Sequence, residues 1–181
     1  MNESLPQASG ASGALDRESL QRLIAATPPL VEGLRDLRDQ VQPNGVDLTL
    51  RSAAWFGSPG QIGVTTEERI LSATAELEFD SEGWAHLAPG PYLITLNEIV
   101  HLPKGIMAVA WPRSSLLRCG VFIHNAVWDA GYEGRSQCLL TVINPHGFRV
   151  ARDSKVLQMV FFTLTQTVAE GYQGKYQSEN M

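Results

Sequence analysis

The stretch from Cys138 to Leu164 reads CLLTVINPHGFRVARDSKVLQMVFFTL. It contains two runs rich in Val, Ile, Leu, Thr and aromatic residues, Cys138–Ile143 and Lys155–Leu164, and the turn-forming residues Asn144-Pro145-His146-Gly147 follow the first run. Such residues favour strands, and neither run repeats at helical spacing. The stretch therefore predicts two β-strands separated by a turn.

The same alternation of short apolar runs and turn residues extends back to Pro43. Turn signals occur at Ser58-Pro59-Gly60, at Ala88-Pro89-Gly90-Pro91 and at Pro103-Lys104-Gly105. Short strands with turns at this density indicate an all-β sandwich or barrel. The four additional runs are Val46–Leu50, Tyr92–Leu96, Ile106–Trp111 and Val121–Ile123.

The two ends of the chain have a different character. Residues 1–14 are rich in Ser, Gly, Ala and Gln, and we expect them to be a disordered leader. Residues 15–42 are a predicted helical segment, in which Asp16 caps a helix that ends at Thr27-Pro28-Pro29. Residues 170–181 contain almost no aliphatic side chains, so we expect a flexible C-terminal arm.

The composition excludes several classes of protein. The 181 residues include 14 Lys+Arg and 19 Asp+Glu, a net charge of −5, and suit one domain. With 44% hydrophobic and 18% charged residues, the chain is neither wholly disordered nor a coiled coil. It has no visible signal peptide and no apolar run near the roughly 20 residues of a membrane span. The pI near 5.3 disfavours nucleic-acid binding, and the two cysteines suit a reducing cytoplasm.

The sequence contains no recognisable motif for a metal site or for a catalytic nucleophile. The four histidines and two cysteines lack zinc-ligand spacing, so we expect no structural metal site. No local signature supports a Ser or Cys nucleophile, although a triad assembled in space stays open. We expect Cys119 and Cys138 to be small buried hydrophobes.

Pro112-Arg113-Ser114-Ser115-Leu116-Leu117-Arg118 follows one of the apolar runs. If a helical turn begins here, its backbone N–H groups and two serine hydroxyls converge on one spot. The two guanidinium groups then add donors suited to phosphate. The alternative is an ordinary helix start with serine caps and solvated arginines. Local composition favours neither interpretation.

Two further segments carry polar and aromatic groups. The first is Val127-Trp128-Asp129-Ala130-Gly131-Tyr132-Glu133-Gly134, whose Asp-Ala-Gly is a hairpin signal with Asp129 at the entry. An Asp in a turn often only caps its own backbone. The second is Gly171-Tyr172-Gln173-Gly174-Lys175-Tyr176-Gln177, which is either a glycine-hinged arm that closes over an anionic ligand or a frayed terminus.

Taken in order, these segments resemble the motifs of the dUTPase/dCTP deaminase superfamily. The last motif is similar to the deaminase-type tail, and the early helix also occurs in the deaminase branch and its archaeal-type dUTPase relatives. The resemblance covers the chain from about Pro43 to Gln177. In chain order the matching segments are Asn44–Leu48, Pro112–Arg118, Asp129–Gly134, Lys155–Phe161 with Gln158, and Gly171–Gln177.

The resemblance implies a distorted β-barrel of jelly-roll type over residues 43–169, and homotrimers with active sites shared between subunits. It also implies a deoxyribonucleoside triphosphate substrate with Mg²⁺ held mainly by the phosphates and no direct protein ligand. An acidic protein can bind this polyanion because Mg²⁺ neutralises phosphate charge and a few basic residues supply a local positive field. Nucleic-acid and membrane partners are not expected.

Two reactions share this scaffold. Diphosphatases release pyrophosphate, whereas deaminases attack C4 of cytosine with water and need a carboxylate near the base. In the deaminases that carboxylate is a Glu on the strand after the hairpin, but here Arg135–Asn144 contains no acid. Glu133 lies in the turn, where we expect it to be solvated. We therefore expect a dUTP diphosphatase of the deaminase-like branch, which makes dUMP and pyrophosphate and keeps uracil out of DNA.

The resemblance also implies roles for single residues. Asp129, ionised at neutral pH, orients the attacking water, and Ser114 and Arg118 assist catalysis. Tyr132 packs on the deoxyribose, while Asn125 and the backbone near it read the pyrimidine edge. A dCTP deaminase or bifunctional enzyme, and an inactive nucleotide-binding regulator, remain alternatives. The expected substrate-binding residues are Arg113, Ser114, Ser115, Arg118, Asn125, Ala126, Asp129, Tyr132, Gln158, Tyr172, Lys175, Tyr176 and Gln177.

Overall fold

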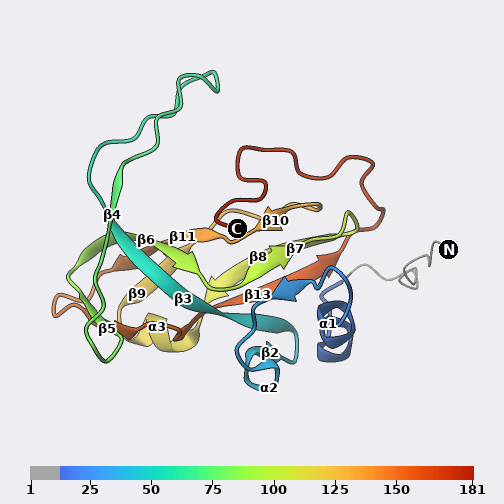
Figure 1. Ribbon diagram of the computed structural model, residues 1–181, viewed down its shortest axis with the longest axis horizontal. Helices are drawn as coiled ribbons and strands as arrows, with labels where there is room; N and C mark the ends of the chain where they lie inside the picture. Colours follow the sequence, from blue (N-terminus) through green and yellow to red (C-terminus); the bar gives the residue numbers. More distant parts are fainter. Residues whose placement is uncertain (1–12) are drawn as a thin grey trace.

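A strongly curved antiparallel sheet forms the body of the protein in the computed structural model, which describes residues 13–181 (Figure 1). Its strand order is β8-β13-β3-β6-β11-β9, and β2 and β4 pair with β3. Each of the six predicted apolar runs matches one of these strands, and two runs extend one residue beyond theirs, at Ile143 and at Leu164. The strands are β2 Val41–Gln42, β3 Gly45–Phe56, β4 Thr74–Glu76, β6 Gly90–Leu96, β8 Ile106–Pro112, β9 Val121–His124, β11 Gln137–Val142 and β13 Lys155–Thr163.

Five short strands complete the fold and were not predicted from the sequence. Three of them form a sheet in the order β1-β7-β10, and β5 pairs with β12. A bridge from Ala108 to Trp128 joins the edge strand β8 to the loop after β9, so the curved sheet nearly closes. The predicted all-β, barrel-like fold is confirmed. The short strands are β1 Val31–Glu32, β5 Trp84–Leu87, β7 Ile99–His101, β10 Glu133–Gly134 and β12 Phe148–Ala151.

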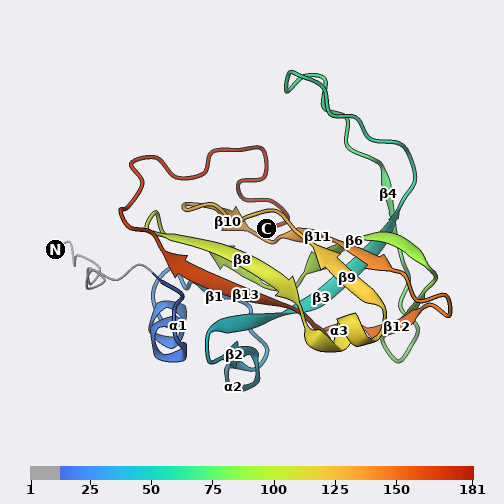
Figure 2. The same cartoon turned by 180° about the vertical axis from the view of Figure 1, so that it is seen from behind.

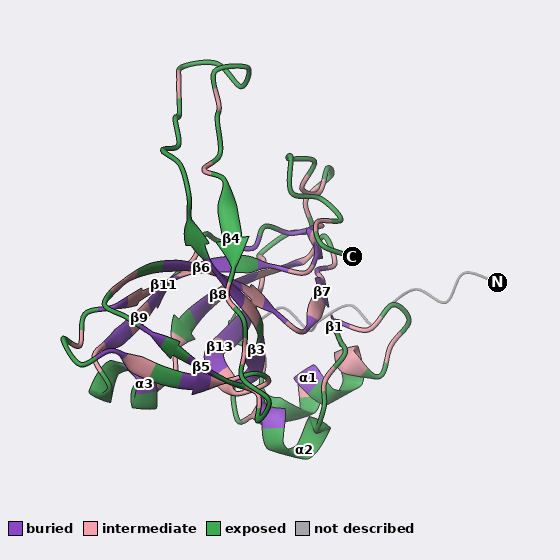
Figure 3. Ribbon diagram, turned by 60° about the vertical axis from the view of Figure 1, so that its left-hand side comes forward, coloured by how far each residue is buried: buried purple, intermediate pink, exposed green. Residues whose placement is uncertain are grey.

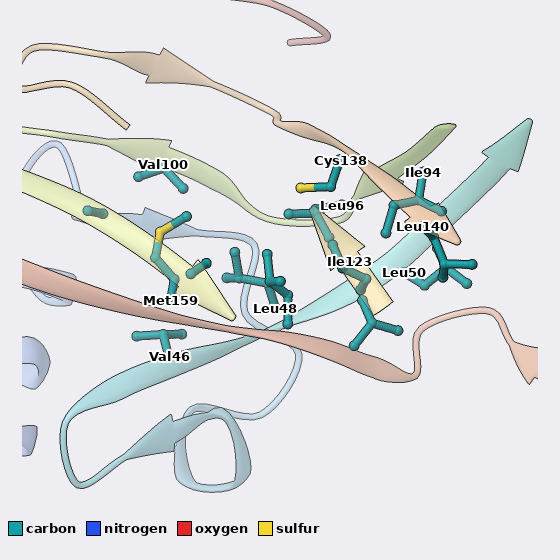
Figure 4. Packing of buried hydrophobic residues seen from close by; sticks show 14 of the residues in the cluster. Val46, Leu48, Leu50, Ile94, Leu96, Val100, Ile123, Cys138, Leu140 and Met159 are labelled. Atoms are coloured by element: carbon teal, nitrogen blue, oxygen red, sulfur yellow. The ribbon is translucent and has the colours of Figure 1, made fainter. Parts of the chain in front are cut away.

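The core lies inside the curve of the sheet (Figure 4). Along β6 every second side chain is buried, as period-two alternation requires of a strand with one covered face. Burying one Leu or Ile completely contributes about 1.5–3 kcal/mol relative to leaving it in water. Figure 3 shows this burial concentrated in the central strands, and the labelled core residues include Leu48, Leu50, Ile94, Leu96, Leu140 and Met159.

The helical segment before the barrel contains α1, Arg17–Ile24, and α2, Leu37–Gln40. The Asp16 carboxylate accepts a hydrogen bond from the Ser19 amide at 2.8 Å, which confirms the predicted cap. Of the predicted leader, residues 1–12 lie outside the described residues, and Ala14 forms a bridge with Phe162 of β13. No helix among residues 13–181 is long and apolar enough to cross a membrane.

A projecting loop, residues 57–73, extends away from the barrel between β3 and β4 (Figures 1 and 2). A single bridge, Gln61 to Ile70, ties its two arms together. The predicted turn at Ser58–Gly60 lies at its base. Large apolar side chains, including Ile62 and Val64, are exposed on it.

Candidate active site

A cleft of about 820 Å³ opens where the projecting loop, the hairpin between β9 and β11, and the C-terminal segment meet. No lysine or arginine is among the described residues that line it. The hairpin contributes Ala126, Val127, Trp128, Asp129, Tyr132 and Ser136, and the C-terminal segment contributes Tyr172, Tyr176 and Glu179.

The hairpin presents Asp129 to this cleft. The Tyr132 amide donates to the Asp129 carbonyl at 3.1 Å, and Gly131 adopts a φ of +86°, which glycine accepts at little cost. A Cβ on Gly131 would lie 2.6 Å from the Cα of Gly171, so this position needs glycine for space as well. The Asp129 carboxylate is exposed and has no hydrogen-bond or ion-pair partner among residues 13–181. It therefore does not cap its own turn.

Tyr132 lies beside Asp129 but is buried. Its ring packs edge-on against Tyr172, with the ring centroids 5.7 Å apart. Burial raises the pKa of Tyr132 far above its ordinary value, so the phenol stays neutral.

The C-terminal segment folds back onto the hairpin of the same chain (Figure 1). The Tyr172 amide donates to the Ala130 carbonyl at 2.8 Å, and the Gln177 side-chain amide donates to the Gly131 carbonyl at 3.1 Å. Lys175 is exposed and does not line the cleft. The predicted arm thus lies over the predicted hairpin, and its flexibility stays a prediction.

A second group of predicted residues gathers at the far end of β8. In the register of the sheet, Gln158 of β13 pairs with Asp47 on one side and with Trp111 on the other. The Arg113 Nε lies 3.4 Å from a buried Asp47 carboxylate oxygen, and the Lys155 Nζ lies 3.9 Å from the same oxygen. Burial raises the pKa of Asp47, and the two cations act in the opposite direction. Asp47 therefore anchors the cation that precedes α3.

The helix α3 spans Ser114–Arg118 and begins directly after Arg113. No side chain caps it, and the hydroxyls of Ser114 and Ser115 have no hydrogen-bond partner in the described part of the chain. The capping interpretation of this segment therefore does not hold, and both hydroxyls are free to bind a ligand. Arg118 donates to the Ser114 carbonyl at 3.1 Å.

The two groups of predicted residues do not meet within one chain. Trp128, next to Asp129, pairs with Ala108, whereas Arg113 follows Pro112. Four residues of strand separate Ala108 from Pro112, which corresponds to about 13 Å. The cleft contains Ala126, Asp129, Tyr132, Tyr172 and Tyr176, while Arg113, Ser114, Ser115, Arg118, Gln158, Asn125, Lys175 and Gln177 lie outside its lining.

Two expectations about single residues were wrong. Cys119 is exposed rather than buried, because it is the cap at the end of α3, whereas Cys138 is buried and its pKa is raised to about 12. Glu133 does not lie in the turn: it belongs to β10, and its carboxylate lies 3.2 Å from the His101 Nδ1, although its side chain is 40% exposed, as expected. No three His, Cys, Asp or Glu side chains within residues 13–181 form a group that could hold a metal ion.

Sequence reasoning missed several residues of the two sites. Asp47 and Lys155 fall in segments that matched family motifs, so the signal was present but no role was assigned. Ser136 and Glu179 line the cleft, and no local pattern marks either of them.

Comparison with known proteins gives consistent matches. A family model described as dCTP deaminase-like matches residues 14–164. The probable deoxyuridine 5'-triphosphate nucleotidohydrolase of Methanococcoides burtonii is 46% identical over 167 residues, which is 92% of this chain and 98% of that protein. The protein of the same description from Archaeoglobus fulgidus is 42% identical over 152 residues, 84% of this chain and 89% of that protein.

Among solved structures, the 2'-deoxycytidine 5'-triphosphate deaminase from Agrobacterium tumefaciens superimposes with a TM-score of 0.63 at 27% sequence identity. The match covers 84% of this chain and 48% of the deaminase. The chain thus spans about half the length of that protein.

Proposed function

Since the chain belongs to the dCTP deaminase-like family, we propose that it is a dUTP diphosphatase, which hydrolyses dUTP to dUMP and pyrophosphate. The archaeal relatives described as dUTP nucleotidohydrolases support this choice over nearly the whole chain. The observation that carries it is the unpartnered Asp129 carboxylate in the cleft, together with a β11 strand that bears no acidic residue.

In this proposal Asp129 orients and deprotonates the water that attacks the α-phosphorus. An exposed carboxylate without a partner among residues 13–181 is accessible to a water molecule and to substrate. Tyr132 is the platform for the deoxyribose, and Asn125 with the backbone at Ala126 reads the pyrimidine edge. Phosphoryl transfer depends mainly on positioning and on charge stabilisation, so the phosphates need cations that the cleft itself lacks.

We infer that a neighbouring copy supplies those cations in a homotrimer. Arg113, Ser114, Ser115, Arg118 and Gln158 form a set of donors at the far end of β8 that does not line the cleft of the same chain. If copies pack so that α3 of one meets the cleft of the next, every site contains both Asp129 and the α3 donors. In a closed ring of three copies, every cleft has such a neighbour.

Mg²⁺ accompanies the triphosphate in this proposal. The substrate phosphates hold it without a direct protein ligand, and no group of three His, Cys, Asp or Glu side chains within residues 13–181 offers an alternative site. Mg²⁺ keeps several non-protein ligands and commonly binds through substrate phosphates. When bound, it lowers the negative charge that the arginines must balance.

The C-terminal segment completes the site. Tyr172 and Tyr176 already line the cleft, and Lys175 is exposed on the same segment. With nucleotide bound, Lys175 reaches the terminal phosphate as a point charge. The tyrosines exclude water other than the nucleophile. The two thiols are free, as in proteins of the reducing cytoplasm, where we place this activity.

The test is an incubation of the purified protein with Mg²⁺ and dUTP, dCTP or dTTP in turn, followed by chromatography of the products and an assay for ammonia. We expect dUMP and pyrophosphate from dUTP, and neither ammonia nor dUTP from dCTP. Ammonia from dCTP would support the deaminase alternative, which the similarity to the Agrobacterium deaminase favours. Binding of dUTP without any product would indicate an inactive regulator.

A further inference from the structure

Four side chains form a continuous hydrogen-bond chain along the wall of the cleft. The Trp128 Nε1 donates to the Ser136 Oγ at 2.6 Å, and the Ser136 Oγ lies 3.1 Å from the Tyr132 hydroxyl. The Tyr132 hydroxyl donates to the Glu179 Oε1 at 2.9 Å. Three of these residues belong to the hairpin, and the fourth belongs to the C-terminal segment.

The chemistry of the groups fixes the direction of this chain. An indole N–H can only donate, so the Ser136 oxygen accepts from Trp128. The serine proton is then available to the Tyr132 oxygen. The tyrosine proton points to the Glu179 carboxyl group, whose Oε1 accepts it. Each donor has one acceptor, and hydrogen bonds aligned in this way strengthen one another.

The two hydroxyls in the middle of this hydrogen-bond chain and the carboxylate at its end are held in place. Ser136 is 3% exposed and Tyr132 is 6% exposed, so neither hydroxyl can exchange its partner for bulk water. Glu179 is positioned by its backbone, because it forms a parallel bridge with Gly134 and its carbonyl accepts from the Arg135 amide at 2.9 Å. The phenol of Tyr132 is therefore fixed by two oxygens while Tyr172 packs against its ring.

We propose that Ser136 and Glu179 are positioning residues that lock the ring of Tyr132 and thereby set the preference for deoxyribose over ribose. The inference rests on the proposed function, in which Tyr132 is the platform for the sugar. A ring that closes off space for a 2′-hydroxyl discriminates only if it cannot move aside. Within residues 13–181, Ser136 and Glu179 supply every hydrogen bond of its hydroxyl.

This role links sugar selection to the C-terminal segment. Glu179 lies 47 residues beyond Tyr132, in the segment that also carries Tyr172 and Tyr176. Docking of this segment therefore completes the sugar pocket as well as covering it. A chain in which the segment is docked without Glu179 should still bind dUTP but admit UTP more readily.

The decisive quantity is the ratio of kcat/KM for dUTP to kcat/KM for UTP. We expect Ser136→Ala and Glu179→Ala to lower this ratio by about tenfold, in line with losing a hydrogen bond to a charged or buried partner. The kcat for dUTP should change far less. Glu179→Gln keeps an acceptor for Tyr132 and should retain most of the ratio. The matched control is Glu170→Ala, an exposed acid of the same segment, which should behave as wild type.

If Ser136 and Glu179 were purely structural, their loss would lower kcat/KM equally for dUTP and for UTP. An unchanged ratio in Glu179→Ala would therefore overturn the proposal. Because Ser136 is buried, its variant is paired with Glu179→Ala, which alters the partly exposed end of the chain.

A second measurement does not depend on turnover. The exchange of the Tyr132 hydroxyl proton with water, followed by NMR, should be slow in wild type and Glu179→Gln, and faster in Glu179→Ala and Ser136→Ala. Fast exchange in wild type would refute the locking. Slow exchange that the two alanine variants lose would support it even if the protein hydrolysed neither dUTP nor UTP, an outcome that would refute the proposed function alone.

Discussion

Asp129 is the residue on which the proposed chemistry depends. It follows a Trp that is fixed by its pairing with β8, and it precedes a turn that needs glycine at position 131. The backbone on both sides is therefore rigid, while the carboxylate itself is exposed to the cleft. In our proposal this carboxylate holds the attacking water, and it has no competing partner among residues 13–181.

The change Asp129→Asn should abolish pyrophosphate release and preserve nucleotide binding. The amide keeps the shape of the carboxylate but accepts no proton, so we expect turnover to fall by at least about 10²-fold. Affinity should hold or increase, because a negative charge near the phosphates is removed. Steady-state kinetics and calorimetry with a non-hydrolysable dUTP analogue measure the two effects. Turnover above a few per cent of wild type would exclude Asp129 as the base.

At the scale of elements, α3 and the link between β6 and β7 show two uses of polar groups. In α3 the serine hydroxyls and the Arg118 guanidinium face outward and are available to a ligand. In the link, Glu98 is buried and joins three elements: its carboxylate accepts from the Thr49 amide at 2.9 Å, the Thr49 hydroxyl at 2.7 Å and the Gln40 side chain at 2.8 Å. In our proposal the first arrangement binds the triphosphate, whereas the second holds α2 against β3.

Removal of a donor from α3 should weaken triphosphate binding without harming the fold. A hydrogen bond to a charged group contributes about 1.5–3 kcal/mol, so Arg118→Ala or Ser114→Ala should raise the KM for dUTP, or lower kcat/KM, by tenfold or more. Kinetics with dUTP provide the measurement, and Arg17→Ala, an exposed arginine of α1, is the control. Unchanged kinetics in both variants would show that Arg118 and Ser114 do not bind the triphosphate.

Glu98 should make stability depend on pH in a defined direction. Burial raises its pKa above the ordinary 4.5, and its hydrogen bonds offset this only in part. The folded chain then binds a proton that the unfolded chain releases, so the stability contributed by Glu98 falls as the pH rises from 4.5 through the raised pKa.

The change Glu98→Gln removes this titration. As the pH rises from 4.5 through the raised pKa of Glu98, we expect the Tm of the variant to improve relative to the Tm of wild type. This trend is expected whatever the difference in Tm between the two proteins at low pH. Thermal unfolding at a series of pH values gives the comparison, with Glu82→Gln, an exposed acid, as control. Parallel curves for wild type and Glu98→Gln would show that Glu98 does not titrate differently in the two states.

At the scale of the whole molecule, the predicted site residues fall into two groups. The cleft with Asp129 has no lysine or arginine among its described lining residues. Arg113 and α3 follow the end of β8, and Pro112 lies about 13 Å along that strand from Ala108, the partner of Trp128. We therefore propose that a ring of copies brings Asp129 of one chain and Arg118 of the next to the same triphosphate.

Mixing two impaired variants tests this arrangement. Homotrimers of Asp129→Asn should be nearly inactive, and homotrimers of Arg118→Ala should have lost at least about tenfold in kcat/KM. In trimers formed by co-expression, a site is intact when an Arg118→Ala chain supplies Asp129 and an Asp129→Asn chain supplies Arg118. With equal amounts this happens with probability one half times one half, so about a quarter of wild-type activity should return. No recovery in isolated mixed trimers would place both residues in one chain's site.

The C-terminal segment is expected to act on the assembled site rather than on the fold. Truncation after Glu170 removes Tyr172, which packs against the core, so Tm should fall modestly while dUTP turnover collapses and KM rises. Truncation after Gln177 is the informative control, because it keeps Lys175 and the tyrosines but removes Glu179. This shorter truncation should retain dUTP turnover and lose sugar selectivity. Wild-type kinetics in the longer truncation would mean that the segment is only a frayed end.

The sequence by itself predicted the all-β fold class, the helix that Asp16 caps and most of the candidate site residues. These are local properties: β-branched and aromatic runs favour extended backbone, an Asp accepts from the amide three residues on, and a motif keeps its residue types. The short strands β1, β5, β7, β10 and β12 escaped prediction because two to four residues carry little propensity and become strands only through their partners.

Only the tertiary structure decided which groups meet. The register of β13 between β3 and β8 brings Gln158, Asp47 and Arg113 together, although they are spread over more than a hundred residues. Glu179 reaches Tyr132 through backbone pairing with β10, which leaves no pattern in the side chains. Long-range contacts depend on strand order and on the curvature of the sheet, and these arise from the packing of the whole core rather than from any one segment.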